Sequence, residues 1–143
     1  DALAATKAAV AEGIVPGGGT AYIRSIEVLE NVKGDNDDQT TGINIIKKSL
    51  EAPLKQIVEN AGDEQGDVIV HQVKTGKPGI GYNARTEQFE NLLESGVIDP
   101  TKVVRTALEN AASVASMILT TECVIAEKPA DEPPMNLGQM PSM

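Results

Sequence analysis

The sequence predicts a mainly α-helical fold, a helical bundle with one small β-hairpin and a short terminal strand. Apolar residues make up 41% of the chain and aromatic residues only 2%, so alanine, valine, isoleucine and leucine must build the core. Alanine is the strongest helix former, which favours helices throughout. Asp99 and Pro100 precede a long helical pattern, as expected of an N-cap acid with proline at the first helical position.

Capping and breaking residues mark four helices in the first part of the chain. Gly13 suits the left-handed position after a helix end, and Gly62 provides a similar stop later. Ile43, Ile46 and Leu50 have the spacing of an inward helix face. The expected spans are Ala2 to Glu12, about Gly19 to Val32, Gln39 to Leu50 with Asp37 or Asp38 as its N-cap, and a helix with Pro53 in its first turn that stops at Gly62.

The second part of the chain begins with an ambiguous segment. Asp63 to Gly76 contains a β-branched run typical of a strand, but its acidic start and final glycine are typical of a helix, so both interpretations stay open. Apolar residues on both sides of Asn83 to Thr86 then indicate a small hairpin. A short helix from Asn91 to Ser95 is expected to follow.

The long helix is predicted to run from its Asp99 cap to about Thr121. Seven residues are expected on its buried side, namely Val104, Ala107, Leu108, Ala111, Ala115, Ile118 and Leu119. The β-branched residues from Thr121 to Glu127 predict the terminal strand. From Lys128 onward, prolines and methionines without an apolar pattern predict a disordered tail.

Charge and cysteine content narrow the classes of partner and compartment. The net charge is −9, with 21 acidic against 12 basic residues, which argues against nucleic acid or an anionic membrane because phosphates would be repelled. The single Cys123 cannot form an internal disulfide, which fits a reducing compartment such as the cytoplasm. No apolar run reaches the ~20 residues that span a bilayer.

Gly17, Gly18 and Gly19 form the most informative motif. Three residues without side chains leave backbone N–H groups bare at a helix start, where an anion or a nucleotide can approach. The triplet is neither a Walker A loop, since no Gly-Lys-Ser/Thr follows, nor a dinucleotide fingerprint, since a helix precedes it. A tight turn between two packed helices is the alternative interpretation. Asp1 lies one helix away and would by itself be an ordinary cap or surface acid.

No metal site is predicted from the sequence. His71 is the single histidine and has no second ligand at metal-binding spacing, so it is interpreted as a surface or structural residue. Asp35, Asp37 and Asp38 resemble part of a calcium loop, but neither the glycine at the sixth position nor the glutamate at the twelfth is present.

Two long segments carry a family resemblance. DALAATKAAVAEGIVPGGGTA resembles the signature segment of GroEL-type (group I) chaperonins, where the intermediate domain returns to the equatorial domain. GYNARTEQFENLLESGVIDPTKVVRTALENAASVASMILTTECVIAEKP is similar to the end of that equatorial domain. The resemblance reaches Pro129 and favours a helix for Asp63 to Gly76. It implies a returning helix of the intermediate domain at 1–12, the C-terminal half of the equatorial ATP-binding domain at 13–127, and a tail at 128–143.

The resemblance also implies an activity and site residues. The intact subunit would be an ATPase of a double-ring folding machine that uses ATP with Mg²⁺, whose ligands lie mostly outside this segment. Asp1 would activate the attacking water, while the nucleoside end would be held by Gly18, Asn83, Ala84, Val97 and Asp99. The implied partners are other subunits in a homo-oligomeric ring, unfolded polypeptides and a co-chaperonin lid, with neither nucleic acid nor a membrane.

Two alternatives from other classes remain. A chain that begins without an initiator methionine and inside a helical pattern is expected to be a fragment, and it could be a non-catalytic helical piece that self-associates through exposed former interfaces. A stand-alone nucleotide-binding domain would instead need a phosphate loop, which the sequence does not contain.

Overall fold

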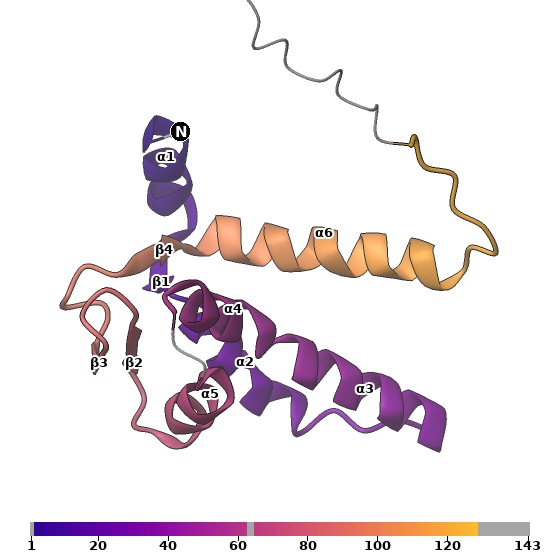
Figure 1. Ribbon diagram of the computed structural model, residues 1–143, viewed down its shortest axis with the longest axis horizontal. Helices are drawn as coiled ribbons and strands as arrows, with labels where there is room; N and C mark the ends of the chain where they lie inside the picture. The colour runs from indigo at the N-terminus through magenta and orange to yellow at the C-terminus, as the bar shows by residue number, and fades with distance from the viewer. Residues whose placement is uncertain (1, 63–64, 129–143) are drawn as a thin grey trace, which may run out of the picture.

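The structure is a computed structural model that describes residues 2–62 and 65–128. It is mainly helical, as predicted, and contains two small antiparallel sheets (Figure 1). The elements are α1 (Ala2–Glu12), β1 (Ile14–Pro16), α2 (Thr20–Leu29), α3 (Asp37–Ser49), α4 (Ala52–Asn60), α5 (Gly66–Thr75), β2 (Ile80–Asn83), β3 (Gln88–Asn91), β4 (Ile98–Pro100) and α6 (Thr101–Leu119).

The hydrophobic core lies where α2, α4 and α5 pack beside the hairpin. Its buried members are Ile23, Ile26, Leu50, Leu54, Val58, Ile69, Val70, Val73 and Tyr82. On α5 the buried residues Ile69, Val70 and Val73 recur at helical spacing, which confirms the helix interpretation of this segment. Its first residues, 63–64, lie outside the described part of the chain.

Local capping explains where the helices begin and end. The span of α1 agrees with the prediction, and Gly13 ends it at φ 81° while its N–H donates to the Ala9 carbonyl at 2.8 Å. At α3 the predicted cap was wrong, because Asn36 is the N-cap and its Oδ1 accepts from the Gln39 N–H at 2.9 Å. The two aspartates therefore fall inside the first turn, where negative charge stabilises the helix dipole.

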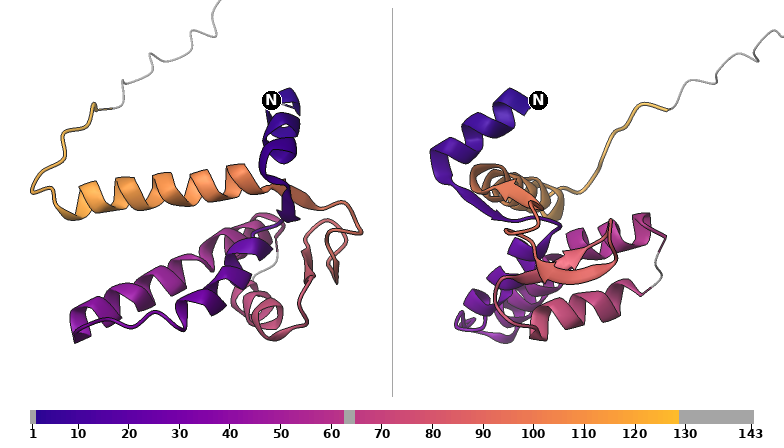
Figure 2. Two further views of the ribbon diagram at one scale, coloured as in Figure 1. Left: turned by 180° about the vertical axis from the view of Figure 1, so that it is seen from behind. Right: turned by 90° about the vertical axis from the view of Figure 1, so that its left-hand side faces the viewer.

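The α3 helix points away from the core (Figure 2). Only Leu50, at its C-terminal end, is buried, whereas Ile43 is half-buried and Ile46 is 46% exposed. The expectation that all three face inward was therefore wrong. The hydrophobic stripe is present, but the described chain supplies little to cover it.

Strands β1 and β4 form an unpredicted sheet in which Val15 pairs with Asp99. Asp99 is therefore a strand residue, and its predicted role as an N-cap was wrong. The helix α6 begins at Thr101, whose N–H donates to the Gly13 carbonyl at 3.0 Å, so backbone pairing replaces the expected side-chain cap. This sheet joins the exit of α1 to the entry of α6.

The predicted hairpin is confirmed as β2 paired with β3. Tyr82 lies opposite Phe89, with ring centroids 5.2 Å apart. The short helix expected from Asn91 to Ser95 is a single turn instead, closed by the Ser95 N–H donating to the Asn91 carbonyl at 3.0 Å. Leu92 within this turn is fully buried.

The C-terminal part of the described chain differs from expectation in two ways. No residue of α6 is buried: on its predicted inner side Val104 is half-buried and the other six residues are exposed. Residues 121–128 form no strand, because no strand of the described ranges pairs with them, and they are exposed. Apart from Lys128, the predicted tail lies outside the described residues. None of the helices in residues 2–62 and 65–128 combines the length and apolar character needed to cross a membrane.

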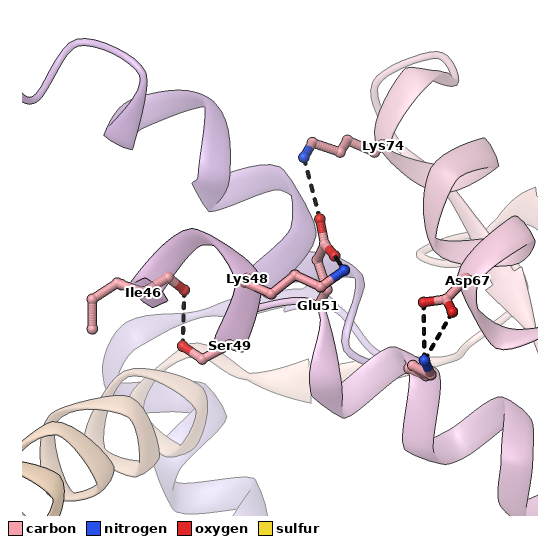
Figure 3. A network of polar contacts seen from close by, with 7 residues as sticks. Ile46, Lys48, Ser49, Glu51, Asp67 and Lys74 are labelled. Atoms are coloured by element: carbon pink, nitrogen blue, oxygen red, sulfur yellow. Dashed lines mark hydrogen bonds and ion pairs between the residues drawn. The ribbon is translucent and has the colours of Figure 1, made fainter. Parts of the chain in front are cut away.

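Ion pairs join the helices that support the hairpin (Figure 3). Glu51 contacts both Lys48 at 3.0 Å and Lys74 of α5 at 3.2 Å, and Lys55 contacts Asp67 at 2.9 Å. Burial by itself raises the pKa of Glu51, but the hydrogen bonds from the two lysines outweigh it and lower that pKa. The pairs hold α4 against α5.

Candidate nucleotide-binding site

The glycine triplet makes a tight turn between β1 and α2. Gly17 donates its N–H to the Val97 carbonyl at 2.9 Å, which ties the turn to the segment before β4. Gly19 lies at φ 75°, and a Cβ there would be 2.7 Å from the Leu54 nitrogen, so α4 packs directly against it. The packing interpretation of the triplet is therefore supported at Gly17 and Gly19.

Gly18 is the open member of the triplet. A Cβ built on it would meet nothing nearer than the Tyr82 carbonyl oxygen at 3.5 Å, and its φ is 62°. Within the described part of the chain, its backbone N–H has no hydrogen-bond acceptor. A bare N–H beside open space can donate to a ligand.

Asn83 organises the tip of the hairpin. Its Nδ2 donates to Glu90 Oε1 at 2.6 Å, and its Oδ1 accepts from the Arg85 N–H at 3.1 Å. The Thr86 N–H closes the turn by donating to the Asn83 carbonyl at 3.2 Å. Because both ends of the buried amide are engaged, its orientation is determined by these partners.

These segments surround one cavity of about 700 Å³. Its lining residues are Gly18, Ile57, Tyr82, Asn83, Ala84, Arg85, Thr86, Glu90, Ser95, Gly96 and Val97. The structure thus brings together four of the residues singled out in the sequence: Gly18, Asn83, Ala84 and Val97. They come from three separate segments of the chain.

Glu90 is a lining residue that sequence reasoning missed. Asn83 pairs with Gln88, so Glu90 is its diagonal neighbour on the same face of the hairpin. The hairpin register was the signal that could have found it. Register depends on where the turn lies, and the expected turn, 83–86, lies one residue before the turn that forms, 84–87.

Asp99 does not line the cavity but lies two residues beyond Val97 on β4. Burial raises the pKa of its carboxyl, and no ion pair to it occurs among residues 2–62 and 65–128. Burial raises the pKa of the Tyr22 hydroxyl, and the nearby charge of Asp99 raises it further. That hydroxyl donates to the Val104 carbonyl at 2.9 Å. Asp1 lies outside the described residues.

The cavity has apolar walls and a polar edge. Val97, Ala84 and Ile57 supply apolar wall, and the Asn83 amide supplies the polar edge, a combination common in small-molecule sites. Among the described residues no group of three or more histidine, cysteine, aspartate or glutamate side chains could hold a metal ion.

Known proteins share the sequence pattern and the fold of this chain. Residues 1–129 match the TCP-1/cpn60 chaperonin family. Among solved structures, the open-state monomer of a group II chaperonin from Methanococcoides burtonii has a similar fold, with a TM-score of 0.65 and 24% identity. The match covers 76% of this chain and 28% of that chain, so this chain spans less than a third of that relative's length.

Proposed function

Because this chain belongs to the TCP-1/cpn60 chaperonin family, we propose that it is part of a GroEL-type, group I subunit of an ATP-dependent chaperonin. The support for group I is the sequence of the two segments that contain the glycine triplet and the Asn83 turn. The group II structure is only 24% identical, so it informs the fold and not the subgroup.

The proposed contribution of this segment is the nucleoside end of the ATP site. The single observation that carries it is the convergence of Gly18, Asn83, Ala84 and Val97 on one cavity with apolar walls and a polar edge. Val97 and Ala84 would pack on the base, Asn83 would face its edge, and the Gly18 backbone would allow close approach. Asp99 would accept hydrogen bonds from the ribose hydroxyls through a carboxylate that has no ion-pair partner in the described chain.

The remaining chemistry involves groups outside the described residues. Asp1 would orient the attacking water and take its proton. Bound Mg²⁺ would neutralise charge on the phosphates, which the acidic Asp1 requires in order to act beside them. In the intact subunit, ATP turnover would drive a cytoplasmic double ring of identical subunits that encloses unfolded polypeptides under a co-chaperonin lid.

Nuclear magnetic resonance on the ¹⁵N-labelled chain tests the nucleoside assignment. Adenosine is expected to shift the amide signals of Gly18, Ala84 and Val97 in a saturable manner, while signals of α3 stay unchanged. Uncharged adenosine avoids any need for the missing phosphate ligands. Shifts confined to other surfaces, or none at millimolar nucleoside, would remove the assignment.

The water-activating role of Asp1 is tested separately in the intact subunit. Asp1→Ala is expected to lower ATP turnover by ~10²–10⁴, the usual contribution of a general base, with ATP affinity largely retained. Asp99→Ala should instead weaken ATP binding. The chain alone is expected to show no steady phosphate release, because it lacks the phosphate and metal ligands. Parallel loss of affinity and rate in Asp1→Ala would contradict the role.

Self-association is a second candidate property, favoured by one observation. No residue of α6 is buried, although it has an amphipathic apolar stripe that includes Leu108, Val114 and Ile118. An apolar hollow of about 610 Å³ also lies between α1 and α6, around Ala8 and Val103. Exposed apolar surface of this kind marks a site of protein–protein association.

A further inference from the structure

Glu90 differs from the other acids whose contacts define this fold. Glu12, Glu51, Asp67 and Glu109 each contact a lysine or arginine within 4 Å. Glu90 lines the cavity, is half-buried, and forms no ion pair with any cation of the described ranges. Its partner is the neutral amide of Asn83, which donates to Oε1 at 2.6 Å.

The second carboxylate oxygen of Glu90 is consequently available to a ligand. No hydrogen-bond donor to Oε2 is found among residues 2–62 and 65–128. A carboxylate has about four acceptor positions and no donor when ionised. A ligand that meets this wall must therefore present a hydrogen-bond donor, because an acceptor would be repelled.

We propose that Glu90 makes the cavity select a base that carries an exocyclic amino group, which is adenine in the proposed ATP site, by accepting a hydrogen bond from that group through its carboxylate. This inference rests on the proposed nucleoside site and adds a selecting residue to it. Asn83, besides facing the edge of the base, then also positions Glu90, because it donates to Glu90 and is itself oriented by the Arg85 N–H. Purines that lack the amino group would leave a desolvated carboxylate without a donor, which is costly.

The test compares adenosine with purine riboside, which has hydrogen in place of the amino group. Dissociation constants come from chemical-shift titrations of the labelled chain and its Glu90→Ala variant. Neither nucleoside carries a phosphate, so removing an acidic side chain does not change the binding by relieving charge repulsion. Glu94→Ala is the matched control, since it removes one acid from an exposed position in the neighbouring turn that does not line the cavity.

The chain and Glu94→Ala are expected to bind adenosine about tenfold or more tightly than purine riboside, as for a hydrogen bond to a charged group. Glu90→Ala should bring that ratio close to one. If Glu90 has only a structural role, Glu90→Ala will weaken the binding of both nucleosides equally and leave the ratio of their dissociation constants unchanged. That result would overturn the proposal. Absence of binding for both nucleosides by the unmodified chain would overturn it together with the nucleoside site.

Glu90→Gln keeps the test decisive if the alanine variant fails to fold. If the glutamine oxygen keeps the hydrogen bond from Asn83 Nδ2, its NH₂ group faces the amino group of the base. If the oxygen faces the amino group instead, the hydrogen bond from Asn83 is lost and the acceptor is uncharged. Both arrangements lower the preference for adenosine. An unchanged preference in Glu90→Gln would contradict the proposal.

Discussion

Arg105 of α6 and Glu12 at the end of α1 meet through two parallel hydrogen bonds. Nη2 lies 2.7 Å from Oε1, and Nε lies 3.1 Å from Oε2. The third nitrogen, Nη1, binds Glu109 on the same helix at 2.8 Å. Figure 1 shows α1 standing steeply off α6, so this contact spans the junction at Gly13. The two helices are therefore tied by side chains as well as by the backbone of β1 and β4.

The first prediction concerns the pH dependence of this junction. The hydrogen bond from Arg105 lowers the pKa of Glu12, so the pair stabilises the junction above the usual carboxylate range and is lost as pH falls through the lowered pKa. The protection of the amides of residues 9–13, that is, their exchange rate relative to the intrinsic rate at each pH, should decrease as the solution is acidified. Glu12→Gln should show low protection with much weaker pH dependence. Identical profiles for both proteins would contradict this.

The second prediction separates steric from conformational cost at glycine. Gly19→Ala and Gly62→Ala both place a side chain at positive φ, which costs about 1–2 kcal/mol. Only at Gly19 would the new Cβ collide with the backbone of Leu54, whereas nothing lies within 4 Å at Gly62. Urea unfolding should show a clearly larger loss for Gly19→Ala. Equal losses would mean that α4 can move aside.

The third prediction uses the buried carboxyl of Asp99. Burial raises the pKa of Asp99, so at pH values between the unfolded and the folded pKa the folded chain holds a proton that the unfolded chain has released. The stability of the fold therefore falls as pH rises through this interval. Asp99→Asn should therefore be more stable than the natural chain at neutral pH while binding nucleotide less well in the intact subunit. Urea unfolding between about pH 4 and 7 measures the first effect.

Asp67→Asn provides the control of opposite sign. Hydrogen bonds from Lys55 lower the pKa of Asp67, so its contribution is present at neutral pH and lost in acid. The variant should be less stable than the natural chain at neutral pH, or unchanged if solvent screens the exposed pair. If Asp67→Asn stabilises the chain and Asp99→Asn does not, the opposite effects assigned to these two carboxyl groups are wrong.

The fourth prediction concerns self-association through α6. Ile118 is 60% exposed on this uncovered helix, so Ile118→Glu should reduce the weight-average mass seen in sedimentation at increasing concentration. Val28→Glu places the same charge on α2, where Val28 is 69% exposed, and should change the association little. A strictly monomeric natural chain at all concentrations would contradict the second candidate property.

Local signals predicted α1 but left α5 undecided between helix and strand. Gly13 ends α1 where the left-handed preference of glycine places the end, and α5 follows the spacing of Ile69, Val70 and Val73 once the family resemblance favours a helix. Capping was harder to predict, since Asn36 competes with two neighbouring aspartates and each can accept the same N–H. Choosing between them needs the actual backbone geometry.

Contacts between distant segments could not be predicted from the sequence. β1 and β4 are short, and their pairing depends on the return of the chain through α2–α5. The β-branched residues after Thr121 predicted a strand, but a strand needs a partner, and none is present among the described residues. Four of the site residues converge on one cavity, while Glu90 emerged only from the register of the hairpin. The roles of all of these residues stay a prediction.

The two tyrosines give this protein an intrinsic optical reporter. The chain has no tryptophan, so near-ultraviolet absorption and emission come almost entirely from Tyr22 and Tyr82. Tyr82 lines the cavity, and Tyr22 is hydrogen-bonded to α6 beside the Asp99 charge. Events at the cavity and at the entry to α6 can therefore be followed spectroscopically in the unlabelled protein, and replacing either tyrosine by phenylalanine assigns the signal to one of the two locations.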